Sequence, residues 1–168
     1  MKNKALFPLL AVLIITSFFI NSCKKEDKSN IPNLLTTGVW QLASLQVDHY
    51  IGDSRISTDT LNADCDTSQL FTFNKDYTCT YTNYSCKPQP TAKGTWALTN
   101  NKLYLSSDIT VQDTTAVGKS QPFLEVQIIN LGQFSLAFNT GDISAYYSSA
   151  QKRTIRRYGF IRQKTTSN

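Results

Sequence analysis

Few residues of this sequence have the types and spacing that catalysis or metal binding requires. His49 is the only histidine, and no cysteine or carboxylate accompanies it at the spacing of a metal site. Asp48, Asp64 and Asp66 show no pairing suited to acid–base work, and no serine lies in a nucleophile-elbow pattern. We therefore expect no catalytic residue, no metal and no cofactor, in a protein that is not an enzyme.

The first of the four cysteines has the clearest chemical context. Cys23 follows two lysines and an almost wholly apolar stretch, residues 5–20, which is the order of a secretory signal peptide. Residues 20–23, Ile-Asn-Ser-Cys, resemble a bacterial lipobox, whose thiol is acylated and becomes the new N-terminus after cleavage. An uncleaved membrane anchor is the alternative. We expect a signal peptide over 1–22 and a lipid on Cys23 that makes the membrane a partner.

A charged segment follows Cys23. Residues 24–30, Lys-Lys-Glu-Asp-Lys-Ser-Asn, have too little apolar surface to fold and predict a solvated tether over 23–35. A similar charged run in Bacteroidetes lipoproteins resembles a signal for export to the cell surface, and a plain spacer is the other interpretation. We expect an outer-membrane lipoprotein that faces the periplasm or the cell surface.

The charge of the mature chain is mild. Without Lys2 and Lys4, 15 basic residues remain against 12 acidic ones, a net charge of +3. These basic residues are scattered except for Arg153, Arg156 and Arg157. Together with the exported compartment, this pattern excludes nucleic acid as an expected partner.

Strand signals dominate from Gly38 onward, and no long segment has a helical period after the signal peptide. A single helical turn is expected over 31–37. The sequence predicts one all-β domain over 36–164, followed by a tail over 165–168. Its eight strands are predicted at 38–47, 69–74, 78–84, 94–99, 102–106, 122–130, 133–139 and 153–163.

Short and long connections alternate strictly between these strands. Three are tight turns with suitable Asn, Asp or Gly, and four are long. In an up-and-down meander, such alternation places all tight turns at one end and all long loops at the other. We therefore predict an eight-stranded antiparallel barrel with one closed end and one loop-ringed end, where the loops are functional or merely decorative. The tight turns lie at 74–77, 100–101 and 131–133, and the long loops at 48–68, 85–93, 107–121 and 140–152.

The second hairpin fixes a register that includes the cysteines. With a three-residue loop at 75–77, Phe73 faces Cys79 and Phe71 faces Tyr81, all on the apolar face. Tyr77 then takes a left-handed position that favours glycine.

The same register, continued outward, brings Cys65 within one residue of Cys86, so these two are predicted to form a disulfide at the open end. Cys79 is expected to be a buried free thiol.

The chain resembles the lipocalins. The resemblance is carried by Gly38-Val39-Trp40 at the start of the first strand, by the eight-stranded meander and by a basic residue in the last strand. It implies a tryptophan across the closed end, Trp40, with Arg156, Arg157 or Arg162 packed over it. More closely, the chain is similar to lipocalin-like lipoproteins of Bacteroidetes, in the lipobox, Cys65, residues 71–76, Cys86, Gly94-Thr95-Trp96 and Asn101-Lys102-Leu103.

An eight-stranded barrel is wide enough either to be filled by side chains or to hold one small ligand. We predict a monomer that binds or carries a small hydrophobic ligand. The alternative is a cell-surface module with a filled barrel, whose loops contact a protein or a glycan. The predicted ligand-binding residues are Trp40, Phe71, Tyr81, Trp96, Phe138 and Tyr158. Other inward positions predicted by alternation are Leu42, Phe73, Cys79, Leu98, Leu103, Leu105, Leu124, Val126, Ile128, Phe134, Leu136 and Phe160.

Overall fold

The computed structural model describes residues 30–61, 68–113 and 118–164. No helix within these ranges has both the length and the apolar character needed to cross a bilayer. The elements in chain order are α2 (Ile31–Thr36), β1 (Val39–Ile51), β2 (Ser54–Leu61), β3 (Leu70–Phe73), β4 (Thr78–Thr82), η2 (Tyr84–Cys86), β5 (Ala92–Leu98), β6 (Tyr104–Ser107), β7 (Val111–Asp113), β8 (Gly118–Ser120), β9 (Val126–Leu131), β10 (Ser135–Gly141) and β11 (Lys152–Arg162).

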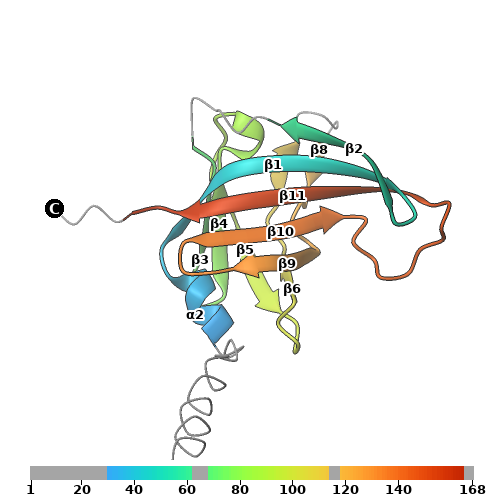
Figure 1. Cartoon of the computed structure of the whole chain (residues 1–168). Helices are drawn as coiled ribbons and strands as arrows, with labels where there is room; N and C mark the ends of the chain where they lie inside the picture. Colours follow the sequence, from blue (N-terminus) through green and yellow to red (C-terminus); the bar gives the residue numbers. More distant parts are fainter. Residues whose placement is uncertain (1–29, 62–67, 114–117, 165–168) are drawn as a thin grey trace, which may run out of the picture.

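Eight of the strands form a closed antiparallel barrel (Figure 1). The order around the barrel is β1, β3, β4, β5, β6, β9, β10 and β11, and β11 pairs with β1 to close the ring. This arrangement confirms the predicted all-β fold.

Three further strands lie in segments that the sequence predicted to be loops. The predicted loop 48–68 contains the end of β1 and all of β2, and the predicted loop 107–121 contains the small β7–β8 hairpin. Every residue of β2 is exposed, so this strand has no need to alternate apolar and polar side chains. A prediction based on alternation therefore missed it.

The second half of β1 runs beyond the barrel. Residues 39–41 pair with β3, but residues 45–51 pair with β2 on that side and with β11 on the other. Figure 1 shows β1 and β11 continuing to the right, with the β1–β2 hairpin at their far end. We call residues 45–51, β2 and residues 152–158 the strand extension.

The tip of the strand extension is fixed by an arginine between aromatic rings. The guanidinium carbon of Arg153 lies 3.4 Å from the ring centre of Tyr147 and 5.4 Å from that of Tyr50. Arg153 also donates a hydrogen bond of 3.0 Å to the carbonyl of Gly52, and the Tyr147 hydroxyl donates to Asp53. These contacts hold the β10–β11 connection against the β1–β2 turn.

The β3–β4 hairpin has the predicted register. Phe73 pairs with Cys79 and Phe71 pairs with Tyr81, and all four side chains are buried. Tyr77 has φ +64°, the left-handed conformation that the loop requires. Cys79 is a free, buried thiol as predicted, and burial raises its pKa.

The closed end of the barrel is built around Trp40. Its side chain is fully buried, and its Nε1 donates a 2.9 Å hydrogen bond to the Leu35 carbonyl in α2. Of the three candidate arginines, Arg162 covers Trp40. Its guanidinium carbon lies 4.5 Å from the centre of the Trp40 ring. Arg162 also donates a 2.7 Å hydrogen bond to the Leu34 carbonyl. One cation therefore links the last strand, the first strand and α2.

Most positions predicted to face inward are buried, Leu98 and Ile128 are partly buried, and three are exposed. Leu103, Leu124 and Phe134 are 46%, 49% and 67% exposed. Each lies just before the first residue of its strand, because β6, β9 and β10 begin at residues 104, 126 and 135. The backbone at these positions belongs to a turn, so the alternation of a strand does not apply to it.

The residue missed at the centre of the core is Phe123, which is fully buried. Its ring centre lies 5.0 Å from those of Phe71 and Tyr81, 5.3 Å from that of Tyr158 and 5.8 Å from that of Phe138. Phe123 precedes β9 and belongs to no barrel strand. The barrel is thus filled from its mouth by a connecting segment.

Replacing Arg162 tests the link at the closed end. We expect Arg162→Ala to lower the free energy of unfolding by about 1–3 kcal/mol, because it removes a cation–π contact and a charged hydrogen bond. Arg157→Ala, which truncates an exposed arginine of the same strand, should cost less than about 0.5 kcal/mol. Urea denaturation measures both values, and equal losses would contradict the assigned role of Arg162.

Replacing Phe123 tests its place in the core. Phe123→Ala should lower the free energy of unfolding by about 3–5 kcal/mol, because it deletes a buried ring and leaves a cavity. Leu124→Ala changes the neighbouring, half-exposed residue and should cost less than about 1 kcal/mol. Guanidinium denaturation of the two variants checks the difference.

Candidate functional site

The six predicted ligand-binding residues come from six barrel strands and are all buried. The structure brings four of them together around Phe123, one each from β3, β4, β10 and β11. These four are Phe71, Tyr81, Phe138 and Tyr158. We call them the aromatic cage.

The two tryptophans lie elsewhere. Trp40 lies beneath Arg162 at the closed end. Trp96 packs against Phe73 and Tyr77, with ring centres 5.7 and 5.3 Å away, and its Nε1 donates a 3.0 Å hydrogen bond to the Asn74 carbonyl. Both tryptophans therefore fix the tight-turn end of the barrel.

The polar groups around the aromatic cage are neutral. The Tyr81 hydroxyl donates a 3.0 Å hydrogen bond to Gln69 Oε1, and burial raises the pKa of Tyr81 and of Tyr158 far above the usual value. Both hydroxyls therefore stay protonated at ordinary pH. An interior of rings, hydroxyls and one amide suits an apolar or uncharged guest, because a buried charge would need a partner.

The mouth of the barrel is covered by segments that connect barrel strands. The sequence predicted a loop at Ile109 and Val111, but strands at Tyr84 and Phe123. Tyr84 of η2, Ile109, Val111 of β7 and Phe123 all enter the core from this side. Gln89 ties the cover together, since its Nε2 donates to the carbonyls of Tyr84 and Gln112, each at 3.0 Å. We call these four buried residues and the segments that carry them the mouth cover.

Sequence reasoning missed the mouth cover for a physical reason. A strand predicted over 122–130 makes Leu124 inward and Phe123 outward by alternation. The observed strand begins at Val126, and the turn before it reverses the pattern. The available signal was Pro122, which is unfavourable inside a central strand and typical of a turn.

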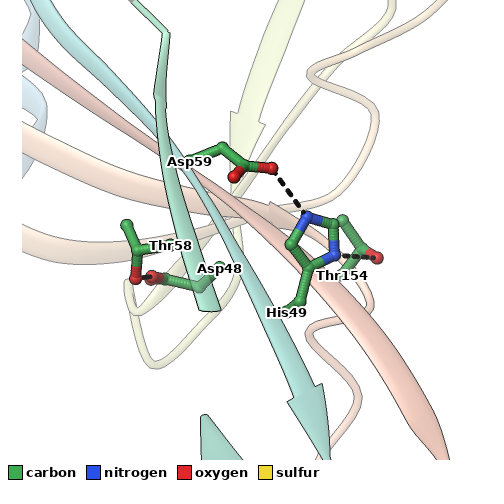
Figure 2. A network of polar contacts seen from close by, with 5 residues as sticks. All are labelled: Asp48, His49, Thr58, Asp59 and Thr154. Carbon is green, nitrogen blue, oxygen red and sulfur yellow. Dashed lines mark hydrogen bonds and ion pairs between the residues drawn. The ribbon is translucent and has the colours of Figure 1, made fainter. Parts of the chain in front are cut away.

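The strand extension contains a polar network around His49 (Figure 2). Its Nε2 lies 3.1 Å from Asp59 Oδ2, and its Nδ1 lies 3.5 Å from the Thr154 hydroxyl. On the opposite face of the strand, Thr58 donates a hydrogen bond to Asp48. His49 was predicted to lie in a loop, but it belongs to β1 and has a carboxylate partner that sequence spacing did not indicate.

A hydroxyl, an imidazole and a carboxylate in line resemble the order of groups in nucleophilic catalysis. Here the hydroxyl-to-imidazole distance of 3.5 Å is too long for an activated nucleophile. The side chains of His49 and Asp59 are 42% and 63% exposed. This network is best described as a cross-strand link that joins β2, β1 and β11. Among the described residues, no three His, Cys, Asp or Glu side chains gather as a metal site would require.

Several hollows lie on the described surface outside the cage. One of about 470 Å3 lies on the outer wall between β5, β6 and Ile143–Ala145. One of about 360 Å3 lies near the mouth and includes Thr140, Thr154 and Arg156. Two of about 500 and 230 Å3 flank α2 at the closed end. None of these four has a residue of the aromatic cage in its wall.

Two of the predicted covalent sites lie outside the described residues. These are Cys23, the predicted lipid anchor, and Cys65, one half of the predicted disulfide. Cys86 is not a free thiol, and its Sγ lies 3.5 Å from Gln69 Nε2. The pairing of Cys65 with Cys86 stays a prediction.

Comparison with known proteins identifies the family. No curated protein matches the sequence. A family model described as a lipocalin-like domain matches residues 36–131, which begin at the last residue of α2 and include the Trp40 strand and the barrel wall as far as β9. The match covers more than half of the chain, and the closed eight-stranded barrel agrees with it. The protein therefore belongs to the lipocalin-like domain family.

Proposed function

We propose that the protein is a membrane-anchored module that binds a small hydrophobic ligand inside its barrel, in the space that Phe123 occupies. The observation that supports this proposal is that the central ring, that of Phe123, comes from a different part of the chain than the rings around it. The aromatic cage belongs to four barrel strands, whereas Phe123 belongs to the mouth cover. A ring that enters from outside the wall can be replaced by a guest without rebuilding the barrel.

The exchange has a defined energetic requirement. Moving the Phe123 ring from the core into water costs about 1.5–3 kcal/mol. A ligand must bury comparable apolar area among the same rings to offset that cost. The Tyr81 hydroxyl and Gln69 then supply neutral hydrogen-bonding groups, which favour an uncharged polar atom at one end of the ligand.

A second candidate function is a cell-surface interaction module with a filled barrel. Two observations favour it. Phe123 fills the cage, and the outer-wall hollow of about 470 Å3 lies beside half-exposed Leu124 and the loop that carries Tyr146, a residue 92% exposed. In this case the ligand is a protein or glycan segment that contacts the loops.

The membrane anchor rests on the sequence. The lipobox at residues 20–23 and the charged tether that follows support acylation of Cys23 and a place in the outer membrane, facing the periplasm or the cell surface. The tether leads directly into α2 at the closed end. Anchoring at that end leaves the mouth pointing away from the bilayer.

Ligand uptake tests the interior site. The mature protein, purified from membranes, should release a defined apolar species on organic extraction, detected by mass spectrometry. Phe123→Ala should bind the hydrophobic probe phenylnaphthylamine more tightly than the parent, because the cage gains space. Ile161→Ala, at an exposed residue in the wall of none of the four hollows, should match the parent.

Phe123→Leu provides a milder variant if the alanine protein fails to fold. An extract without any ligand, together with folded Phe123 variants that take up no probe, would sink the interior site. That outcome favours the interaction module.

Acyl labelling tests the anchor. In a Gram-negative host fed an alkyne fatty acid, the full chain should become labelled and sediment with membranes. Cys23→Ser should abolish the label because it removes the acceptor thiol. Cys79→Ser is the matched control, since it removes a buried thiol elsewhere, and it should keep the label. Equal labelling of all three proteins would show that Cys23 carries no lipid.

A further inference from the structure

Three tight turns surround α2 at the closed end of the barrel. The hollow of about 500 Å3 brings α2 together with the β5–β6 and β9–β10 turns, through Ile31, Leu103 and Gly132 among others. The hollow of about 230 Å3 brings α2 together with the β3–β4 turn, through Pro32 and Tyr77. Figure 1 shows α2 at this end of the molecule. The turns and the helix therefore form one continuous face.

Each of the three turns carries one exposed apolar or aromatic side chain at the closed end, and two of these, Tyr77 and Leu103, are in the walls of the hollows. Tyr77 is 61% exposed, Leu103 46% and Phe134 67%. Ile129, 42% exposed, borders the larger hollow together with Leu103. Tight turns are usually polar, and four large exposed side chains at one end of the barrel make a patch of the kind that marks an interaction site. We call these four residues the closed-end apolar surface.

The position of the N-terminal chain identifies what this surface faces. Asn30, the first described residue, is itself in the wall of the larger hollow. Only six residues separate it from Cys23, so even a fully extended tether spans at most about 25 Å between their Cα atoms. A lipid on Cys23 would therefore hold the closed end close to the membrane.

The charges near this face agree with a membrane partner. Lys75 and Lys102 lie on two of the three turns, with Asp76 beside Lys75. Residues 24–29 hold three lysines against Glu26 and Asp27, so a small net positive charge remains near this face. Basic residues near a bilayer are attracted to anionic headgroups, and aromatic and aliphatic side chains on the same face can enter the boundary between headgroups and acyl chains.

We propose that the closed-end apolar surface inserts into the interfacial region of the bilayer to which the protein is anchored. The inference rests on the proposed lipid anchor at Cys23. It adds a second contact beside the lipid, which fixes the orientation of the domain on the membrane with its mouth pointing outward.

Quenching by lipid tests the contact in the full, lipidated chain. Phe134→Trp is reconstituted into vesicles of phosphatidylcholine and phosphatidylglycerol, with or without bromine on the acyl chains. The matched control is Ile56→Trp, at a similarly exposed apolar residue (61%) on β2 of the strand extension. Brominated lipid should remove most of the fluorescence that the tryptophan at 134 adds to the parent spectrum, and should leave that of the tryptophan at 56 unchanged.

Flotation of the same vesicles separates the two proposals. Protein that does not float with the vesicles shows that the anchor itself has failed. Protein that floats, but whose tryptophan at 134 is quenched no more than the one at 56, overturns the docking proposal and leaves the anchor intact.

A second measurement needs no new tryptophan. With docking, the lysines of the tether should be shielded from trypsin added to the vesicles. The variant Leu103→Ser, Phe134→Ser should be cut faster at residues 24–29 while its melting temperature stays near that of the parent, since both side chains are exposed. Equal cleavage rates for the folded variant and the parent would overturn the contact.

Discussion

The pairing of β1 with β11 closes the barrel, and the rest of the structure depends on it. This seam runs from Trp40 opposite Arg162 at the closed end to Ile51 opposite Lys152 at the far tip. The first part of the seam holds the tryptophan, the arginine and α2 in place. Its middle part brings Tyr158 and Phe160 into the core, and its last part supports the strand extension. An open sheet would lose the contacts of the closed end, the two core rings and the support of the strand extension.

The sequence predicted those features that short-range rules control. The Phe71–Tyr81 register follows from a tight loop and a strict alternation of side chains, and the structure has that register. The lipocalin resemblance implied a cation over Trp40. Three candidate arginines in one strand left the choice open, since only the observed pairing shows that position 162 lies opposite Trp40. Pairing over more than a hundred residues is not contained in a local pattern.

The features that the sequence did not predict correctly have separate physical causes. Strand β2 is exposed on both faces, so it has no apolar periodicity that a sequence pattern could show. Leu103 and Phe134 were predicted to be core residues because alternation was extended past the start of a strand. The strand predicted over 122–130 placed Phe123 on the outward face for the same reason, although its ring is fully buried in the candidate site. The predicted start of a strand therefore determined which face Phe123, Leu103 and Phe134 were assigned to. These residues belong to the proposed ligand site and to the proposed membrane contact.

The strand extension also affects how this protein behaves in a crowded compartment. Among the described residues β2 pairs only with β1, so its outer backbone edge is available to other chains. A bare edge of eight residues could seed intermolecular sheets and aggregation. Arg55 and Asp59 place opposite charges along that edge, and short hydroxyl side chains fill most of the positions around them. The polar composition that left β2 without a recognisable strand pattern thus protects its exposed edge against pairing with other chains.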